Sequence, residues 1–213
     1  MRFTDVAARL EAMPEPLPAP AGILMPVLTG GGDLRRPQMP PPGRPGRPAA
    51  VLVLVYPDES GLARVVLTER ASRDGYHSGE VSFPGGKAEP EDPDPAATAL
   101  REATEEIGLD PVAAGVRLLG RLERFWIPVS DFLVTPIVGV APERPTLVAA
   151  PAEVARIIEP PVSRFLPDAP IAIVERQIGG WPMRYGAYEV EGLSVWGATA
   201  RILSQLGAVL ADA

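Results

Sequence analysis

A change in composition near residue 49 constrains the fold of this chain more than any other feature. Residues 14–48 contain eleven prolines and the glycine-rich runs TGGGD and MPPPGRPGRP. Proline fixes φ and lacks the N–H that helices and sheets use, so we expect an extended, partly polyproline II arm with little regular structure. Before it, residues 1–13 show the apolar spacing of a short amphipathic helix. The sequence therefore predicts an N-terminal helix and arm over 1–48, followed by one domain over 49–213.

From residue 49 onward, segments typical of strands alternate with segments typical of helices. AAVLVLVY at 49–56 and ARVVLTER at 63–70 flank the turn sequence PDESG and predict a hairpin. Further strands are expected at 80–83, 115–122, 132–140, 171–178, 183–190 and 193–196, and helices at 94–107, 151–158 and 197–211. Because strands outnumber helices and the helices are spread along the chain, we expect an α/β fold with a mixed sheet and helices on its faces.

Composition limits the chemistry and the partners of the chain. Cysteine is absent and histidine occurs once, as His77, so any metal must be held by carboxylates, which favours Mg²⁺, Mn²⁺ or Ca²⁺. A net charge of −7 argues against a nucleic-acid surface. No apolar run reaches the roughly 18 residues of a membrane helix, and no signal peptide is recognisable. We expect no nucleic-acid or membrane partner and a cytoplasmic location, and the sequence leaves the oligomeric state open, a homodimer included.

The central helix carries clear start and stop signals. Asp94 suits the N-cap, Pro95 suits the first helical position, and Gly108 can end the helix in the left-handed conformation. One stripe at helical spacing is apolar and is expected to pack on the sheet; it consists of Ala96, Ala99, Leu100, Ala103 and Ile107.

Three glutamates crowd this helix beside its apolar stripe. Glu102, Glu105 and Glu106 lie within five residues, and like charges three or four positions apart destabilise a helix by about 0.2–0.5 kcal/mol per pair. No lysine four residues away compensates for them. A divalent cation bound by two or three of these acids would turn the repulsion into ligation. The alternative is an acidic face that only contacts water.

The same stretch resembles the Nudix signature, in which Gly is followed by Glu and then by Arg-Glu-aliphatic-x-Glu-Glu-x-Gly-aliphatic. The second half matches at Arg101, Glu102, Ala103, Glu105, Glu106, Gly108 and Leu109. The first half departs, because Asp92 stands six residues after Gly86 where the signature has Glu, and Arg101 comes one residue late. We expect Asp92 to pair with Arg101, with Glu89 as the alternative.

Residues 67–86, LTERASRDGYHSGEVSFPGG, resemble the upstream motif of the coenzyme A pyrophosphatase branch of the Nudix superfamily. The matching positions are Leu67, Thr68, Arg70, His77, Gly79, Val81, Phe83, Pro84, Gly85 and Gly86. Ala71, Asp74 and Glu80 replace the motif's Ser, Leu and Gln. FLVTPIVGV, the EVA at 153–155 and VWGATARIL are similar to this branch as well, so the resemblance covers about residues 50–207.

This resemblance implies a fold, a cofactor and a reaction. The fold is an α/β/α sandwich around a mixed sheet, and the cofactor is Mg²⁺ or Mn²⁺ held by Glu102 and Glu106, with the carbonyl of Gly86 as a further ligand. The reaction is hydrolysis of the diphosphate bond of coenzyme A to 3′,5′-ADP and 4′-phosphopantetheine. Glu105 is then either another ligand or the base, and Arg101 orients the acids.

The resemblance also suggests residues that bind the substrate. Arg70, His77, Gly85 and Gly86 are expected to contact its phosphates. Of the aromatic residues, Phe125 and Trp126 are expected in a loop, where they could stack on adenine, whereas Trp181 and Trp196 are expected in the core.

Two other functions stay open. The departures at Ala71, Asp74 and Glu80 leave room for another nucleoside diphosphate derivative, such as ADP-ribose or a dinucleotide. A non-catalytic Nudix-like module that only binds a nucleotide is a second alternative, although its box acids would be expected to be lost. A serine hydrolase is excluded, because His77 is the only histidine and no G-x-S-x-G sequence is present.

Overall fold

The computed structural model describes residues 1–213 except 30–33, 36–38, 72–79, 179 and 212–213. At its centre, β3 (Arg47–Pro57) pairs in parallel with β10 (Phe132–Val140). Antiparallel partners extend this mixed sheet on both sides; they are β4 (Ala63–Val65), β7 (Gly85–Lys87), β8 (Arg117–Arg121) and β9 (Phe125–Ile127).

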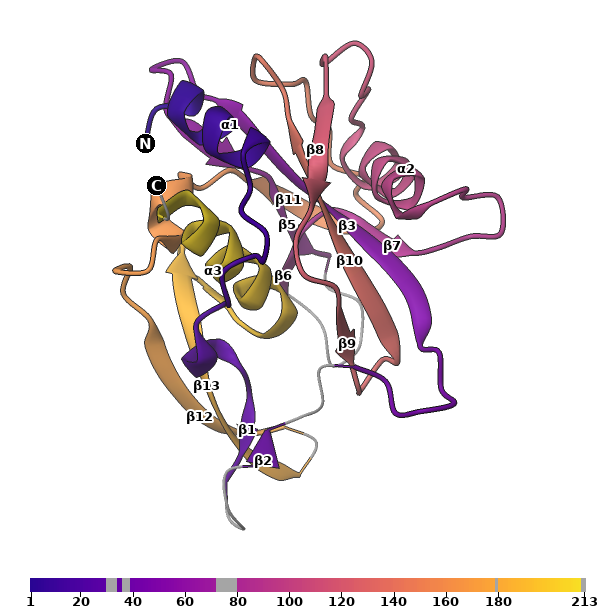
Figure 1. Ribbon diagram of the computed structural model, residues 1–213, viewed down its shortest axis with the longest axis vertical. Helices are drawn as coiled ribbons and strands as arrows, with labels where there is room; N and C mark the ends of the chain where they lie inside the picture. The colour runs from indigo at the N-terminus through magenta and orange to yellow at the C-terminus, as the bar shows by residue number, and fades with distance from the viewer. Residues whose placement is uncertain (30–33, 36–38, 72–79, 179, 212–213) are drawn as a thin grey trace.

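Strand β3 is buried on both faces, which explains why its sequence is almost continuously apolar. Its even-numbered side chains, from Ala50 to Tyr56, share a core with α2 (Pro95–Ile107). Its odd-numbered side chains, including Val53 and Val55, share the other core with α1 (Phe3–Glu11) and α3 (Gly197–Ala211). Figure 1 shows α2 on one side of β3 and β10 and α1 and α3 on the other. The predicted α/β/α sandwich with a mixed sheet is confirmed.

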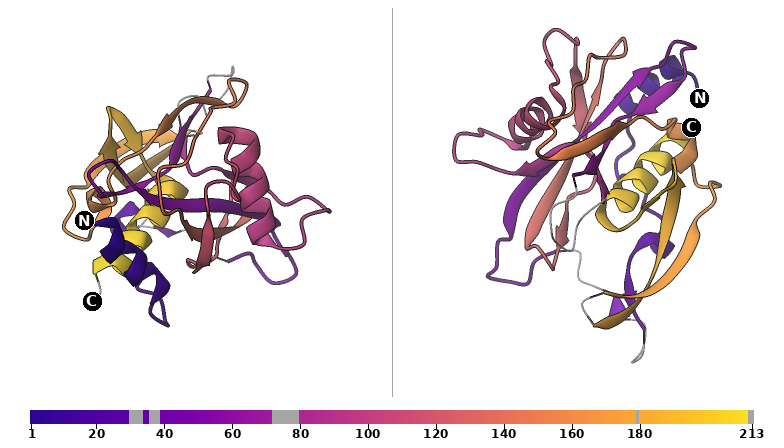
Figure 2. Two further views of the ribbon diagram at one scale, coloured as in Figure 1. Left: turned by 90° about the horizontal axis from the view of Figure 1, so that it is seen from above. Right: turned by 180° about the vertical axis from the view of Figure 1, so that it is seen from behind.

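Two smaller sheets adjoin the central one. In the first, β5 (Leu67–Arg70) lies between β11 (Val154–Ile158) and β6 (Val81–Ser82). In the second, the long hairpin of β12 (Ala172–Ile178) and β13 (Trp181–Val190) extends away from the central sheet, as the two views in Figure 2 show. Strand β14 (Leu193–Val195) pairs with β13 and leads into α3, and a short 3-10 helix, η2 (Val162–Phe165), packs against α3.

The proline-rich segment has more regular structure than its composition predicts. It contains a 3-10 helix, η1 (Gly22–Leu24), and two short strands, β1 (Val27–Leu28) and β2 (Leu34–Arg35). Strand β1 pairs with β13, whose edge supplies the hydrogen-bonding partner that the local sequence lacks. Leu24 is buried, and α3 holds the segment through a hydrogen bond from the N–H of Ala21 to Ser204 Oγ at 2.8 Å. The boundary between 1–48 and 49–213 stays a prediction.

The remaining differences from prediction concern short elements. The helix expected at 151–158 is wrong: residues 154–158 form β11, because Val154, Ile157 and Ile158 are β-branched and β5 offers an edge to pair with. Residues 125–127 form β9 instead of a loop. The strands at 132–140 and 171–178 and the helices at 94–107 and 197–211 are confirmed to within a residue. None of the helices among the described residues has the length and apolar character that a membrane span requires.

Candidate active site

Helix α2 begins and ends where its sequence predicts. Asp94 is the N-cap and accepts a hydrogen bond from the N–H of Ala97 at 2.8 Å, with Pro95 at the first helical position. Gly108 ends the helix in the left-handed conformation, with a φ of 61°. Burial of Ala99 and Ala103 against the sheet sets the rotation of the helix, so that the glutamates lie along the border of the buried stripe.

Two consecutive glycines bring the backbone of β7 against the acids of α2. The N–H of Gly85 donates to Glu106 Oε2 at 3.1 Å. A Cβ atom on Gly86 would lie 2.6 Å from the carboxylate of Glu102, and a Cβ on Gly85 would lie 2.4 Å from the carbonyl oxygen of Ala50. Gly85 also has a φ of +155°. Only glycine therefore lets this strand lie between the helix and β3.

Arg101 links the acids on one side of the site. Its guanidinium forms a bidentate pair with Asp92, with both N···O distances at 3.1 Å. It also donates to Glu102 Oε1, Glu105 Oε2 and the carbonyl oxygen of Lys87, each at 3.0 Å. The predicted pairing of Asp92 with Arg101 is confirmed, and it holds the pKa of Asp92 well below its usual range.

Glu102 and Glu106 are the two half-buried acids of the site. Burial raises the pKa of Glu106 to about 7, and the nearby charges of Glu102 and Glu153 add to this effect, while the hydrogen bond from Gly85 and the charge of Arg70 oppose it. Burial also raises the pKa of Glu102, against the opposing effect of its neighbour Arg101. The arginines near these two carboxylates thus do not provide enough positive charge to offset the effect of burial on their pKa values.

The donors at this place suit a hard divalent cation. Two carboxylates converge on Gly85 and Gly86, the glycine turn where the chain enters β7. Carboxylate oxygens are the ligands that Mg²⁺ and Mn²⁺ prefer. The side chain of Glu105 is more exposed than those of the two converging acids: it is 57% exposed and paired with Arg101, whereas that of Glu102 is 16% exposed. Among the described residues no three acidic or histidine side chains form a complete ligand set. The site therefore fits a cation held by two protein carboxylates, with substrate or water as further ligands.

Glu153 is a charged residue of the site that the sequence analysis did not single out. It lies just before β11, and its carbonyl oxygen accepts a hydrogen bond from the N–H of Ala71 at 2.8 Å. The pairing of β11 with β5, in register at Val154 and Arg70, carries it towards Glu102 and Glu106. The signal for Glu153 in the sequence is EVA at 153–155, which lies within the segment predicted to be a helix.

Other predicted site residues have different locations. Arg70 is exposed at the end of β5, close enough to Glu106 for its charge to act on it, and His77 lies outside the described residues. The stacking role expected of Phe125 and Trp126 is wrong, because both are buried in or beside the core. The indole Nε1 of Trp126 donates to Asp131 Oδ1 at 2.9 Å, so the polar atom of this indole already has a partner within the protein.

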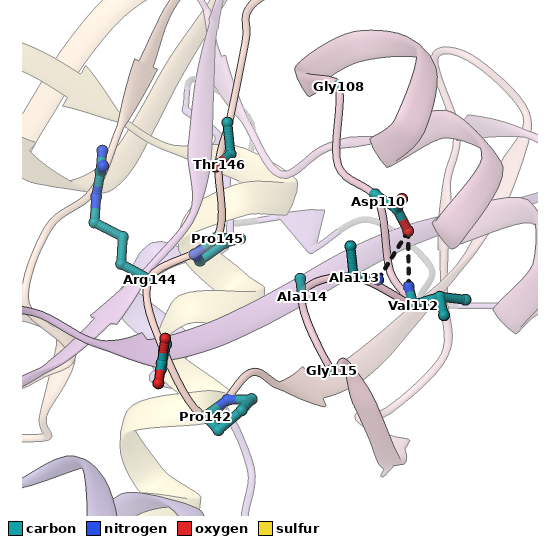
Figure 3. Close-up of a pocket in the computed structure, with 11 residues that line it drawn as sticks. Gly108, Asp110, Val112, Ala113, Ala114, Gly115, Pro142, Arg144, Pro145 and Thr146 are labelled. Atoms are coloured by element: carbon teal, nitrogen blue, oxygen red, sulfur yellow. Dashed lines mark hydrogen bonds between the residues drawn. The ribbon is translucent and has the colours of Figure 1, made fainter.

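A hollow of about 520 Å³ lies beyond the C-terminal end of α2, between segments 108–115 and 142–146 (Figure 3). It contains none of the predicted site residues. The carboxylate of Asp110, which is labelled in Figure 3, accepts hydrogen bonds from the N–H groups of Val112 and Ala113 at 3.0 Å and so stabilises its own loop. We therefore place the candidate active site at the glutamates and the glycine turn.

Comparison with known proteins identifies the family. The NUDIX domain family matches residues 46–163. Nudix hydrolase 15, mitochondrial, from Arabidopsis thaliana is 38% identical over 76% of this chain, and Nudix hydrolase 22, chloroplastic, from the same plant is 39% identical over 76%. The alignments span only 58% and 55% of these two plant proteins. The uncharacterized Nudix hydrolase NudL of Photorhabdus laumondii is 37% identical over 79% of this chain and 90% of its own length. The chain belongs to the NUDIX domain family.

Proposed function

We propose that this chain is a divalent-cation-dependent hydrolase that cleaves the diphosphate bond of coenzyme A or its derivatives, giving 3′,5′-ADP and 4′-phosphopantetheine. One observation carries the proposal: two half-buried carboxylates, Glu102 and Glu106, meet at the Gly85–Gly86 turn without a cationic side chain sufficient to neutralise them. Membership of a family whose relatives are named Nudix hydrolases supports the coarser part, hydrolysis of a nucleoside diphosphate derivative.

In this proposal the protein's residues divide the work. Glu102 and Glu106 hold Mg²⁺ or Mn²⁺, with the carbonyl of Gly86 as a further donor. When bound, the cation would neutralise phosphoryl oxygens and lower the pKa of water. Arg101 positions the acids through its contacts with Asp92 and Glu102. Glu105 is either a further ligand or the base that removes a proton from the attacking water, a role that contributes about 10²–10⁴-fold.

The substrate is proposed from residues next to the acids. Arg70 is exposed beside Glu106, and together with His77 and Gly85 it would contact the phosphates. The resemblance to the coenzyme A motif supports coenzyme A, and the departures at Ala71, Asp74 and Glu80 keep ADP-ribose and dinucleotides as the alternative. The protein would act on this small molecule in the cytoplasm, as a monomer or a homodimer.

A substrate panel tests the proposal. Coenzyme A, ADP-ribose and a dinucleoside polyphosphate are each incubated with Mg²⁺ or Mn²⁺, and products are identified by mass spectrometry. We expect 3′,5′-ADP and 4′-phosphopantetheine, with turnover abolished by chelator. Cleavage of ADP-ribose far faster than coenzyme A would reject the substrate. If Glu102→Gln and wild type bind nucleotide alike and neither turns over, the non-catalytic alternative holds.

A further inference from the structure

Three side chains of the second small sheet form a stacked unit that the proposed reaction does not use. The rings of Tyr185 on β13 and Trp196, just after β14, stack with centroids 4.7 Å apart and planes 28° apart. The guanidinium of Arg176 on β12 lies over both rings, 5.6 Å from the centroid of Tyr185 and 5.2 Å from that of Trp196. We call Arg176, Tyr185 and Trp196 the Arg176 platform.

The burial of the platform leaves its guanidinium as the group that a ligand can reach. Tyr185 is buried and Trp196 is half-buried, whereas Arg176 is exposed. The ring of Tyr185 offers no open face to a nucleobase, because it is only 2% exposed and has Trp196 stacked against it. The part of a ligand that docks here would meet the arginine.

Arg176 is held in place beside the two rings, and Glu80 is the acid whose charge acts on Tyr185 of the platform. Within the part of the chain that the structure describes, no carboxylate forms an ion pair with Arg176, in contrast to Arg101 and Arg156. The guanidinium also donates a hydrogen bond to the side chain of Tyr185. Its remaining N–H groups form a fork that matches the oxygens of a phosphate. Because stacking already restricts the side chain, little further entropy is lost on binding.

The platform lies across β6 from the arginine of the candidate active site. On one side of β6, the N–H of Arg70 donates to the carbonyl oxygen of Glu80 at 2.9 Å. On the other side, β14 packs on β6, and Thr199, three residues after Trp196, donates from Oγ1 to the carbonyl oxygen of Val81 at 2.9 Å. A ligand with its diphosphate at Arg70 and Glu106 could therefore extend across this strand towards Arg176.

We propose that Arg176 is a specificity-determining residue that binds a phosphate monoester carried by the substrate at a distance from its diphosphate. This inference rests on the proposed function and deepens it. A 3′-phosphate on the ribose of a nucleoside 5′-diphosphate derivative is such a group. Tyr185 and Trp196 position the guanidinium, and substrates without the second phosphate lose this contact alone.

The first test measures binding, without turnover. Calorimetry in chelator compares adenosine 3′,5′-bisphosphate with adenosine 5′-monophosphate for wild type, Arg176→Ala and Arg176→Lys. Wild type is expected to prefer the bisphosphate, and Arg176→Ala to weaken only bisphosphate binding, by about 10–100-fold. Arg176→Lys keeps the charge but loses the fork, so its loss should be smaller.

Arg184→Ala is the matched control. Arg184 lies directly opposite Glu175 in the register of the same hairpin. Because neighbouring residues of a strand point to opposite faces, Arg184 lies on the other face from Arg176, and its removal changes the net charge equally. It should leave the preference for the bisphosphate intact. The inference is overturned if wild type shows no preference, if Arg176→Ala weakens both nucleotides equally, or if Arg184→Ala has the same effect.

A second measurement separates this inference from the proposed function. The ratio of kcat/KM for coenzyme A to that for its 3′-dephospho form should fall towards one in Arg176→Ala and stay unchanged in Arg184→Ala. An unchanged ratio in Arg176→Ala rejects the role of Arg176 while diphosphate hydrolysis stands. If wild type cleaves neither compound, the proposed function fails, and the calorimetric comparison alone decides the role of Arg176.

Discussion

Replacing Glu106 by glutamine should stabilise the metal-free protein in alkaline solution. Burial raises the pKa of this carboxyl from its ordinary 4.5 to about 7. Below pH 4.5 the carboxyl of Glu106 is protonated in the folded and the unfolded chain, so the fold carries no buried charge and its free energy of unfolding is at its highest. Between the two values the unfolded chain ionises first, so stability falls as pH rises, and above about pH 7 the loss is complete.

The magnitude follows from the two pKa values. At about 1.36 kcal/mol per pKa unit, ionised Glu106 lowers the free energy of unfolding by about 3 kcal/mol. Glu106 is only half-buried, and solvent screening reduces this figure, so we expect about 1–3 kcal/mol in practice. Glutamine has a similar shape and can still accept the hydrogen bond from Gly85, but it carries no charge at any pH.

The assay is urea unfolding in EDTA near pH 5 and near pH 8.5. Between these two conditions Glu106→Gln should gain stability over wild type, and the titration of groups that do not interact with Glu106 cancels in the difference. Glu105→Gln removes the same charge from the exposed neighbour and should show no such gain. If the two variants behave alike, or if Glu106→Gln gains nothing at the higher pH, the account of Glu106 is refuted.

Excess Mn²⁺ should raise the free energy of unfolding of the wild type, by about 2.7 kcal/mol at a hundredfold excess over Kd, and should not change that of Glu106→Gln.

Three further predictions concern the site and its support. Glu102→Gln should reduce kcat/KM by more than the roughly 10–100-fold that loss of an outer-shell partner costs; a loss no larger than that, measured with Mg²⁺ on the cleaved substrate, would contradict our choice of ligands. Gly86→Ala should displace the Glu102 carboxylate and reduce activity with little change in Tm, whereas Gly85→Ala, which meets backbone, should destabilise the fold by about 1–3 kcal/mol; equal Tm values would reject this distinction. Ser204→Ala removes the acceptor of the Ala21 N–H and should cost about 1 kcal/mol by chemical denaturation, and an unchanged midpoint would mean that the segment is held by other contacts.

The parts of the fold that the sequence predicts correctly are those with strong local signals. The start and end of α2 follow from an N-cap acid, a proline and a glycine, all of which act on their own turn of the helix. Strand β3 is recognisable because burial on both faces requires a continuous apolar run. The Asp92–Arg101 pair could be predicted from residue types and spacing along one short segment.

The parts that were missed depend on partners far away in the chain. Strands β1 and β2 form in a proline-rich segment because β13 presents an edge to them. Residues 154–158 form a strand because β5 presents another edge, and the same pairing brings Glu153 to the site. Neither edge is visible in the segment that uses it, so local propensity gives no signal for these elements.

The charges around the glycine turn show why the acids are crowded without a lysine among them. Asp92, Glu102, Glu105, Glu106 and Glu153 are five acids, whereas two arginines, Arg101 and Arg70, are the cations that act on the pKa values of three of them. Arg101 divides its N–H groups among Asp92, Glu102, Glu105 and the carbonyl of Lys87. Its bonds lower the pKa of Asp92, whereas burial still raises that of Glu102. A lysine one helical turn away would relieve the repulsion and stabilise the isolated helix. It would also occupy the place where a divalent cation can meet a diphosphate, and a side-chain ammonium cannot polarise water as a metal ion does. The folded chain therefore retains a local instability that a bound cation can offset, which is how stability and activity commonly oppose each other at a functional site.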